Sequence, residues 1–349
     1  MAKKRKRKKR HLKLWVKIFF ILVILAILLC PYIYIKNELN FLSGNSNPIN
    51  EIFNSNLEEE LKKAEEEKKR QEEYQACLNE EYSDSDDSEE LTKKIKEVNN
   101  YLSQYKTSVA YLDPNTNFTY NYNSKTVYYA ASTIKMLDAI YIYEKAAQGE
   151  LDLDEEMEYT SKYKWGASTI IGKLQYGTMI KLRDLVKYAI IYSDNSAHVM
   201  LINYIGKSTL KEFGNSLGAK YTLDSDYFGQ INNEDAMIYL KELYNYLNTD
   251  SDDAKELKSY FVDSEQNYLN FPDLNIEAAQ KYGEYDPYYH ENGIVFDDNP
   301  YLVSILTTEG NKENIIRGIN TKIYELHELF YQERESRCKL LLETNKEEN

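Results

Sequence analysis

The alternation of apolar and polar residues along the chain first marks a long apolar stretch near the N-terminus. No charged residue lies between Ile18 and Ile35, and the apolar run reaches back to Leu14 with Lys17 as its one interruption. At about 1.5 Å of rise per residue, a helix of this length crosses the apolar interior of a bilayer. We therefore predict a transmembrane helix over residues 14–35.

Residues 1–17 contain ten Lys or Arg and no Asp or Glu, whereas the chain after the apolar stretch starts with Lys36 and is nearly neutral. Basic residues stay on the cytoplasmic side of a membrane helix. Residues 1–13 are therefore predicted to form a cytoplasmic tail, with everything after the helix outside the cell membrane. Three alternatives fit less well: a nuclear address does not explain the apolar run, a cleavable signal lacks its Ala-x-Ala site, and a lipoprotein anchor at Cys30 lacks the preceding small residue.

Residues 36–90 form a charged segment between this helix and the body of the protein. Almost every residue from 57 to 75 is Glu, Lys, Arg or Gln, and pairs such as Glu59 and Lys63 place opposite charges four residues apart. That spacing stabilises a solvent-exposed helix. The acidic residues 83–90 are typical of a flexible hinge. We predict a helical spacer and a hinge that hold the body away from the membrane.

The body of the protein, residues 91–337, begins with a predicted helix and a predicted hairpin. Apolar residues at helical spacing follow Leu91. Two short apolar segments, residues 108–112 and 118–122, flank the turn-forming sequence Asp-Pro-Asn-Thr-Asn. Such a pair of segments around a turn predicts a β-hairpin.

Helical patterns dominate residues 133–247, and strand patterns return later in the chain. Residues 289–296 and 301–307 are predicted strands, residues 312–334 a final helix, and residues 338–349 a polar tail. Strands at both ends with helices between them, rather than strict alternation, are typical of the α+β class. We therefore predict an α+β domain with an antiparallel sheet built from both chain ends and flanked by helices.

Composition and charge exclude several classes of function. The formal net charge is −14, and without the ten basic residues near the N-terminus it is −24, with 33 basic against 57 acidic residues. Such an acidic body repels phosphate backbones, which excludes nucleic acid as a partner. The three scattered cysteines argue against a disulfide framework, and the four histidines form no H-E-x-x-H motif. We therefore expect neither a metal site nor a cofactor.

Ser132 and Lys135 form an S-x-x-K motif and are the first candidates for catalysis. Of five such motifs, only this one opens an apolar helix, which places Lys135 one turn on and on the same face. A serine hydroxyl needs a base within hydrogen-bond reach, and a buried lysine with a lowered pKa can serve. The alternative is an ordinary helix cap with a surface lysine. The other four motifs begin at Ser103, Ser161, Ser208 and Ser336.

Two further motifs follow along the chain. The sequence S-D-N occurs once, from Ser193 to Asn195, 61 residues after Ser132, and a K-x-G begins at Lys281. A serine can relay a proton, an amide can hold a carbonyl, and a cation on an edge strand can dock a carboxylate. S-D-N is also ordinary turn chemistry, so each motif carries little weight alone.

Taken in order, S-x-x-K, S-D-N and K-x-G resemble the signature of the class A β-lactamase and penicillin-binding serine hydrolase superfamily. The likeness extends through residues 172–177 and 290–295, and covers residues 91–334. The resemblance implies an antiparallel sheet packed on helices, beside a helical subdomain that carries Ser132 and Ser193. The substrate cleft would lie between the two.

The resemblance also implies a role for each motif residue. Ser132 would be the acylated nucleophile, Lys135 its base or proton relay, and Ser193 the group that passes the proton to the leaving nitrogen. Asn195 would bind the amide on the acyl side of the substrate. Lys281 would attract a substrate carboxylate.

The segment after Lys281 carries one departure from the family pattern. Tyr282 stands where the family has Thr or Ser, and its ring should reshape the carboxylate pocket. Gly283 would let the backbone approach closely, and the backbone N–H groups of Ser132 and Glu284 would form the oxyanion hole. His290, on the next strand, either enters this site or packs under a tyrosine.

A second departure concerns deacylation. Hydrolytic β-lactamases carry an E-x-x-L-N loop whose glutamate activates the deacylating water, and residues 218–236 lack that motif. Asp224, Asp226 and Glu234 are the nearby carboxylates, and Glu234 is typical of the first turn of a helix. We therefore expect the dedicated deacylating base to be missing.

Three functional classes remain. The first is a membrane-anchored, extracytoplasmic acyl-serine hydrolase that acts on D-Ala peptides of peptidoglycan in the cell wall or on a related amide or ester. The second is a class A-like β-lactamase that hydrolyses β-lactam antibiotics. The third is a catalytically retired binding or scaffold protein, which Tyr282 favours. The outward orientation and the complete set of Ser132, Lys135 and Ser193 favour the first.

Overall fold

The computed structural model describes residues 48–83, 86–223, 227–310 and 312–347. The chain divides into two compact units, residues 1–72 and 73–349, and the candidate site lies in the second. The predicted transmembrane helix over residues 14–35 falls outside the described residues. Within the ranges that are described, no helix combines the length and the apolar character needed to cross a membrane.

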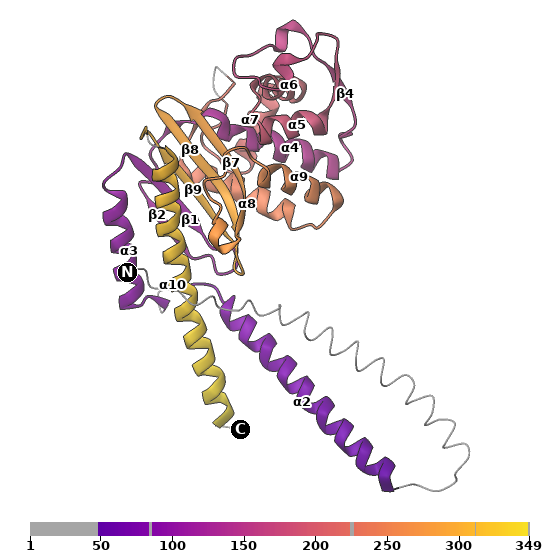
Figure 1. The fold of residues 1–349 in the computed structure, drawn as a ribbon, viewed down its shortest axis with the longest axis vertical. Helices are drawn as coiled ribbons and strands as arrows, with labels where there is room; N and C mark the ends of the chain where they lie inside the picture. The colour runs from indigo at the N-terminus through magenta and orange to yellow at the C-terminus, as the bar shows by residue number, and fades with distance from the viewer. Residues whose placement is uncertain (1–47, 84–85, 224–226, 311, 348–349) are drawn as a thin grey trace, which may run out of the picture. The chain divides into compact units, whose positions relative to one another are not determined.

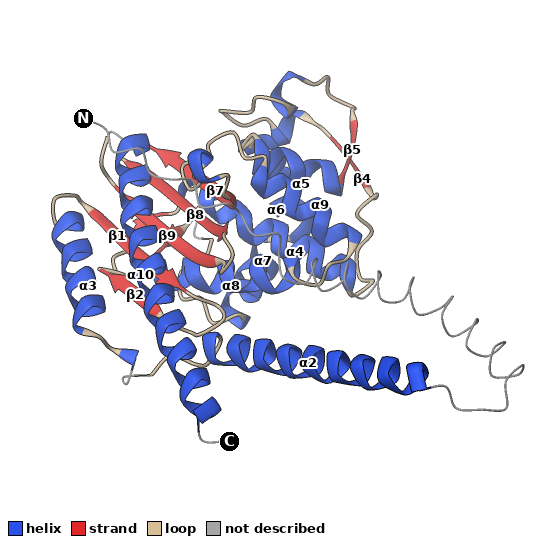
Figure 2. Ribbon diagram, turned by 60° about the horizontal axis from the view of Figure 1, so that its bottom comes forward, coloured by secondary structure: helices blue, strands red, loops and turns tan. Residues whose placement is uncertain are grey.

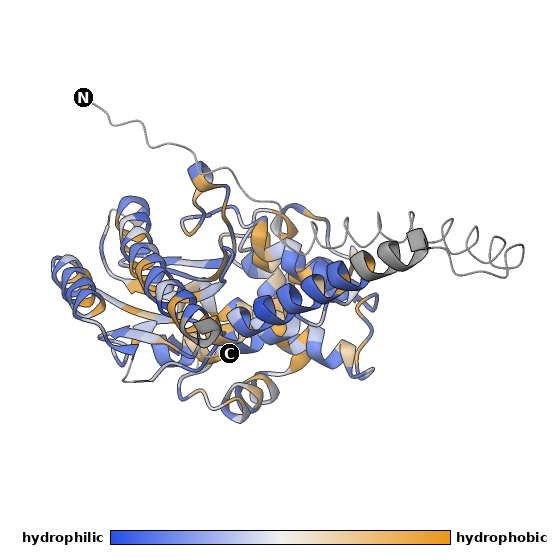
Figure 3. Ribbon diagram, turned by 90° about the horizontal axis from the view of Figure 1, so that it is seen from below, coloured by the Kyte–Doolittle hydropathy of each residue, from blue (hydrophilic) through white to orange (hydrophobic). Residues whose placement is uncertain are grey.

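The charged helix expected over residues 57–75 is present and longer than predicted. Helix α2 runs over Pro48–Leu78. Lys63 and Glu59 form an ion pair at 2.5 Å, one of the predicted pairs of opposite charges four residues apart. Along most of its described length α2 is hydrophilic (Figure 3), as expected for a helix that charge pairs stabilise rather than core packing.

A five-stranded antiparallel sheet carries the second unit, with the strand order β2-β1-β9-β8-β7 (Figure 1). Its strands are β1 (Thr107–Leu112), β2 (Thr119–Tyr122), β7 (Glu277–Tyr285), β8 (Tyr288–Phe296) and β9 (Tyr301–Thr307). β1 and β2 form the predicted hairpin, and β1 pairs with β9 so that Thr107 lies opposite Thr307. The prediction of an antiparallel sheet built from both ends of the chain is confirmed.

Alternate residues along the strands enter two different apolar cores. On β9, Val303 and Ile305 join a core shared with α3 (Glu89–Leu102) and α10 (Lys312–Glu347), whereas Leu302 joins the core of the helical region. Figure 2 shows α3 and α10 together on one face of the sheet. A period of two places alternate side chains on opposite faces of a strand, so both faces of β9 are buried.

The helical subdomain is confirmed on the other side of the sheet. Its helices are α4 (Lys135–Ala147), α5 (Leu182–Ile191), α6 (Asn195–Ile205), α7 (Lys207–Ser216), α8 (Asn233–Leu247) and α9 (Asp252–Val262). Two short ribbons accompany them: β3 (Tyr128–Tyr129) with β6 (Gln230–Ile231), and β4 (Glu156–Glu158) with β5 (Met179–Lys181). Short 3₁₀ helices are η2 (Ala131–Ile134), η3 (Ser161–Tyr163), η4 (Ile171–Lys173) and η5 (Pro272–Leu274). α8 packs against β1 and β9 and so joins the helices to the sheet.

The acidic segment interpreted as a flexible hinge is fixed to the rest of the second unit at Asp86 and Ser88, while Asp87, Glu89 and Glu90 are exposed. Asp86 is buried and forms ion pairs with Arg334, at 3.4 Å, and with Arg337. Ser88 caps α3 by accepting a hydrogen bond from Leu91 N at 2.8 Å. The second compact unit begins at Glu73, so it includes this segment. The sequence pattern does not predict the ion pairs of Asp86, because their partners lie about 250 residues away in the chain.

One disulfide is present, contrary to the expectation from the three scattered cysteines. Cys77, near the end of α2, and Cys338, in α10, are bonded across 261 residues. The final helix continues to Glu347 instead of ending at residue 334, so most of the predicted polar tail is helical. Cys338 is fully buried, whereas a polar tail in solvent would leave its side chain exposed.

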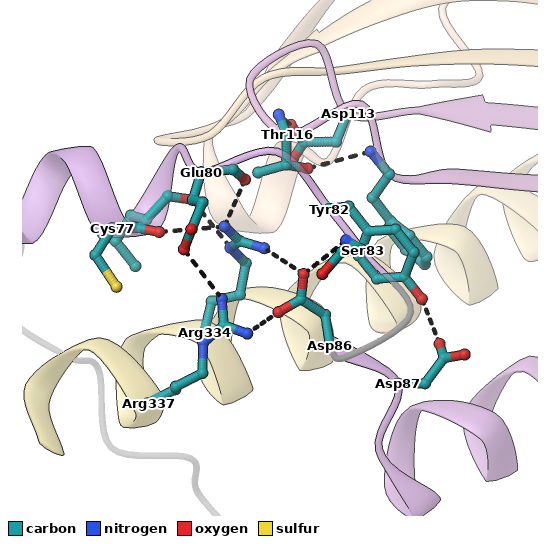
Figure 4. Close-up of polar contacts among 12 residues, drawn as sticks. Cys77, Glu80, Tyr82, Ser83, Asp86, Asp87, Asp113, Thr116, Arg334 and Arg337 are labelled. Carbon is teal, nitrogen blue, oxygen red and sulfur yellow. Dashed lines mark hydrogen bonds and ion pairs between the residues drawn. The ribbon is translucent and has the colours of Figure 1, made fainter. Parts of the chain in front are cut away.

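Arg334 joins the same two segments through backbone groups (Figure 4). Its Nε donates to Leu78 O at 3.0 Å, and its Nη2 donates to Cys77 O at 3.1 Å and to Glu80 O at 2.6 Å. The last carbonyl groups of a helix have no partner within the helix. One buried guanidinium therefore binds carbonyls around the end of α2.

Candidate active site

A tight turn carries Ser132 into the first helix of the subdomain. Ser132 lies in η2, directly before α4, and Ala131 adopts a φ of 47°. A positive φ is unfavourable for a residue with a Cβ, and such strain concentrates at functional sites. Thr133 holds the turn closed because both its N and its Oγ1 donate to Ala130 O, at 3.2 and 2.6 Å.

Lys135 is fully buried at the first position of α4. Its Nζ donates to Ser193 O at 2.6 Å, to Ser193 Oγ at 3.2 Å and to Asn195 Oδ1 at 2.6 Å. Burial lowers the pKa of Lys135 to about 7, although the carboxylates of Asp194 and Asp138 oppose that shift. A lysine with such a pKa exchanges protons near neutral pH.

The S-D-N sequence builds the start of α6 and so places its two flanking side chains. Asp194 is the helix cap and accepts from Ala197 N at 3.0 Å. The preceding Ser193 adopts a φ of 51°, which turns the chain toward Lys135. Asn195 spans the site, because its Oδ1 accepts from Lys135 while its Nδ2 donates to Gly166 O at 2.8 Å.

Lys281 reaches the same serine from the edge strand β7. Its Nζ donates to Ser193 Oγ at 3.0 Å and to Tyr282 O at 2.8 Å, and lies 3.8 Å from the centroid of the Tyr282 ring. Burial, together with the nearby charge of Lys135, lowers the pKa of Lys281 well below its usual range. Ser193 Oγ thus lies between two buried lysines.

Gly283 allows β7 to approach the turn that carries Ser132. A Cβ at this position would come within 2.9 Å of Thr133 Cγ2 and within 3.1 Å of both Thr133 N and Ala130 O. These atoms belong to the turn itself, so a larger residue would push β7 and the turn apart. The absence of a side chain at Gly283 therefore lets β7 lie directly against this turn.

A pocket of about 520 Å³ opens beside Ser132. Of the residues predicted for the site, Ser132, Asn195 and Glu284 line it, while Lys135 and Lys281 are fully buried and are not among its lining residues. Ser132 and Glu284, expected to supply the oxyanion hole, therefore share one cavity. The other lining residues are Tyr129, Ala131, Trp165, Gly166, Ala167, Phe228 and Tyr285.

His290 packs under a tyrosine and does not line this pocket. Its Nε2 donates to Tyr129 O at 2.9 Å, its Nδ1 accepts from Thr307 N at 3.3 Å, and its ring contacts the edge of Tyr128. Burial lowers its pKa to about 4, so the ring is neutral near pH 7. Backbone groups of β3 and β9 engage both ring nitrogens of His290. His290 therefore joins these two strands and is not placed to act as a base.

A buried acid–histidine pair, which the sequence patterns did not predict, lies behind the site. Asp138 and His198 are both fully buried; His198 Nδ1 contacts Asp138 Oδ2, and His198 Nε2 donates to Tyr227 O at 2.9 Å. This contact anchors the segment that carries Phe228, whose ring lies 5.8 Å from Lys135 Nζ. A carboxylate within the apolar start of α4 was the available signal for this pair, because a buried acid needs a partner.

Of the three carboxylates expected after S-D-N, the structure describes Glu234, and Glu234 does not line the pocket. Glu234 is exposed in the first turn of α8, as predicted. Asp224 and Asp226 fall outside the described residues. Among the described residues that line the pocket, Glu284 is the one with a carboxylate, and Gln266 Nε2 donates to it at 3.2 Å.

Comparison with known proteins agrees with this architecture. The family model described as the beta-lactamase enzyme family matches residues 90–326. The β-lactamase of Sphaerobacter thermophilus DSM 20745 superposes with a TM-score of 0.59 at 17% identity, over 68% of this chain and 97% of that one. The β-lactamase of Chitinophaga pinensis DSM 2588 gives 0.60 at 19% identity, over 68% and 98%.

A third solved structure, that of PBP-A, superposes with a TM-score of 0.62 at 14% identity, over 68% of this chain and 96% of that one. At these identities the structural likeness concerns the fold. The family match, in contrast, covers more than half of the chain and includes the S-x-x-K, S-D-N and K-x-G positions. The chain therefore belongs to the beta-lactamase enzyme family, a family of serine hydrolases.

Proposed function

We propose that this protein is a membrane-anchored, extracytoplasmic acyl-serine hydrolase that cleaves an amide or ester bond in the cell envelope. The observation that carries the proposal is the contact of Lys135 Nζ with Ser193, one helical turn from Ser132, which follows the strained Ala131 and lines a pocket. That arrangement supplies a nucleophile, a base and a proton relay.

The reaction proceeds through an acyl-enzyme. Neutral Lys135 takes the proton of Ser132 Oγ, the oxygen attacks the substrate carbonyl carbon, and the backbone N–H groups of Ser132 and Glu284 bind the oxyanion. As the bond to the carbonyl carbon breaks, Ser193 Oγ passes its proton to the leaving nitrogen or oxygen and takes the proton held by the Lys135 ammonium group, which becomes neutral again. Water hydrolyses the resulting ester and restores the Ser132 hydroxyl.

The proposed location rests on two independent observations. The basic residues 1–13 and the apolar residues 14–35 favour a membrane helix with a cytoplasmic N-terminus. The Cys77–Cys338 disulfide favours an oxidising compartment, because disulfides are rare in the reducing cytosol. Both support the proposal that the hydrolase domain lies on the outer side of the membrane, where peptidoglycan D-Ala peptides and β-lactams are the substrates implied by the family resemblance.

Slow deacylation is part of the proposal. The E-x-x-L-N glutamate is absent from residues 218–236. Phe228, whose side chain has no titratable group, lines the pocket, and its ring lies 5.8 Å from Lys135 Nζ. General-base help is worth about 10²–10⁴-fold in rate. An acyl-enzyme formed with penicillin should therefore persist, which separates this protein from an efficient β-lactamase. A structural relative, the L158E mutant of PBP-A, was itself solved as an acyl-enzyme with penicillin G.

Covalent labelling of the full-length protein in detergent tests the assignment. A fluorophosphonate probe should add one label, which the variant Ser132→Ala should lose. Ser161→Ala is the matched control, because Ser161 begins another S-x-x-K but is exposed in η3. Labelling that persists in Ser132→Ala contradicts the nucleophile, and no labelling of the wild type favours a retired binding protein. Nitrocefin turnover at tens per second would instead identify a β-lactamase.

Protease accessibility tests the topology. Protease added to intact cells should digest the domain formed by residues 73–349. Protection until the cells are lysed would reverse the proposed orientation.

A further inference from the structure

Lys281, the cation expected to attract a substrate carboxylate, is shielded from solvent by neighbouring groups of the protein. Its exposed fraction is 0%, and its ammonium group has a partner in each of three directions: Ser193 Oγ at 3.0 Å, Tyr282 O at 2.8 Å and the face of the Tyr282 ring at 3.8 Å. A lysine ammonium has three N–H donors. A carboxylate would therefore have to displace an existing partner to reach Lys281.

Tyr282 is the residue that covers this lysine. It stands where the resemblance expects Thr or Ser, whose small side chains have no ring to lie over an ammonium group. The cation–π contact with its face is attractive, and Tyr282 is itself buried with 9% exposure. The ring is thus held in place by packing as well as by the charge.

The pocket beside Ser132 offers no other cation. Its described lining contains four aromatic side chains and one carboxylate, that of Glu284, but no lysine or arginine. Lys135, the nearest further cation of the site, is fully buried and donates to three oxygens. The aromatic lining residues are Tyr129, Trp165, Phe228 and Tyr285.

These features decide which substrates the cavity stabilises. Transferring a carboxylate from water into a cavity without a cation loses solvation that no positive charge replaces. The faces of aromatic rings carry negative electrostatic potential, and Glu284 adds a like charge. Apolar or aromatic groups, in contrast, gain by leaving water for such a surface.

We propose, on the basis of the hydrolase function proposed above, that this site acylates amides or esters that have no carboxylate on the leaving group and that place an apolar or aromatic group in the pocket. Tyr282 is the specificity-determining residue, because its ring withdraws Lys281 from the substrate. The site thereby differs in substrate class from enzymes that recognise a free C-terminal carboxylate.

Two matched thioesters test the proposal on the full-length protein in detergent. One is the N-benzoylglycyl thioester of thioglycolic acid, and the other is the methyl ester of the same compound, so the two differ at the leaving-group carboxylate. Ser132 Oγ attacks the thioester carbonyl, the C–S bond breaks, the thiol leaves with a proton, and water releases benzoylglycine. Thiol release is measured and each rate is divided by the rate of hydroxide-catalysed hydrolysis.

The wild type should process the methyl ester with a kcat/KM at least about tenfold above that of the free acid. The variant Tyr282→Thr removes the ring that covers Lys281. It should lower the ratio of kcat/KM for the methyl ester to kcat/KM for the free acid by about tenfold. Tyr282→Phe keeps the ring and should keep the wild-type ratio. Because each ratio is taken within one protein, partial loss of folded variant does not alter it.

Each other outcome is decisive. A wild-type preference for the free acid overturns the proposal, and an unchanged ratio in Tyr282→Thr overturns the role of Tyr282. If the fluorophosphonate labels Ser132 but neither thioester reacts, the substrate class is wrong while the hydrolase function stands. If the probe does not label Ser132 either, the proposed function fails and this inference fails with it.

Discussion

The Nζ atom of Lys135 donates to both oxygen atoms of Ser193, at 2.6 Å to the backbone oxygen and at 3.2 Å to Oγ. The two residues lie 58 positions apart in the chain: Lys135 is the first residue of α4, and Ser193 lies two residues before α6. A proton on Lys135 therefore has a short path to the hydroxyl that faces the leaving group in the proposed reaction. The first prediction concerns that proton.

Acylation should depend on pH through Lys135. Burial lowers its pKa to about 7, so the neutral amine that accepts the Ser132 proton dominates above pH 7 and is lost as the pH falls. The rate of fluorophosphonate labelling should fall by about tenfold for each pH unit below 6. Lys135→Arg stays charged at every accessible pH and should label at a small fraction of the wild-type rate. A labelling rate that is flat from pH 5 to pH 9 would contradict the role of Lys135 as base.

Gly283→Ala should disrupt the turn that carries Ser132. The added Cβ would meet Thr133 Cγ2 at 2.9 Å, and a displacement near the reacting atoms of about 1 Å costs about 100-fold in rate. Gly310→Ala is the matched control, because a Cβ there meets nothing within 4 Å. Labelling kinetics should show a loss of about 100-fold for the first variant and none for the second. Equal labelling by both would mean that the close approach of β7 is not required.

Arg334→Ala should destabilise the second unit strongly. The buried guanidinium donates to three backbone carbonyls and pairs with Asp86, so its removal leaves several buried polar groups without a partner. We expect a loss of about 3–5 kcal/mol in the free energy of unfolding, measured with denaturant. Arg334→Lys should not restore it, because an ammonium cannot reproduce the planar fork.

Arg317→Ala serves as the control for this prediction. Arg317 forms a partly exposed ion pair with Glu313 at 3.1 Å, donates to Asn267 and lies 5.2 Å from the centroid of the Tyr268 ring. Exposed ion pairs contribute about 1 kcal/mol or less. If Arg317→Ala and Arg334→Ala unfold at the same denaturant concentration, the carbonyl contacts of Arg334 do not stabilise the unit.

Removal of the disulfide should lower stability without changing the site. Cys77 and Cys338 close a long loop, and loss of such a bond typically costs about 2–5 kcal/mol. Cys77→Ser, Cys338→Ser and the reduced wild type should therefore unfold at similar, lower denaturant concentrations. The rate of Ser132 labelling in the folded protein should be unchanged. Stability that does not respond to reduction would show that the bond is dispensable.

His198→Ala should alter substrate binding through the segment that carries Phe228. The variant loses the donor to Tyr227 O and leaves Asp138 buried without its partner, at a cost of about 1–3 kcal/mol in stability. Because Phe228 lines the pocket, KM should rise more than kcat falls. His327→Ala is the control, since His327 is also buried but contacts Tyr111 in the other core. An equal change in KM in both variants would assign His198 a structural role alone.

Local sequence determined the parts of the molecule whose partners are close in the chain. Ser132 and Lys135 share a helical turn because they lie three residues apart, and Asp194 caps α6 because its carboxylate reaches an N–H three residues on. The hairpin of β1 and β2 follows from two apolar segments around a turn. Such features depend on neighbouring residues, so pattern and spacing suffice to predict them.

Tertiary structure alone decided the properties that depend on distant partners. The lowered pKa of Lys135 requires that other segments bury it, and the withdrawal of Lys281 requires both Ser193 and the ring of Tyr282. The disulfide of Cys77 with Cys338 joins residues 261 positions apart, for which the sequence has no periodic signal. Burial and electrostatic interaction are set by what surrounds a group in space, and the order of residues along the chain does not specify that directly.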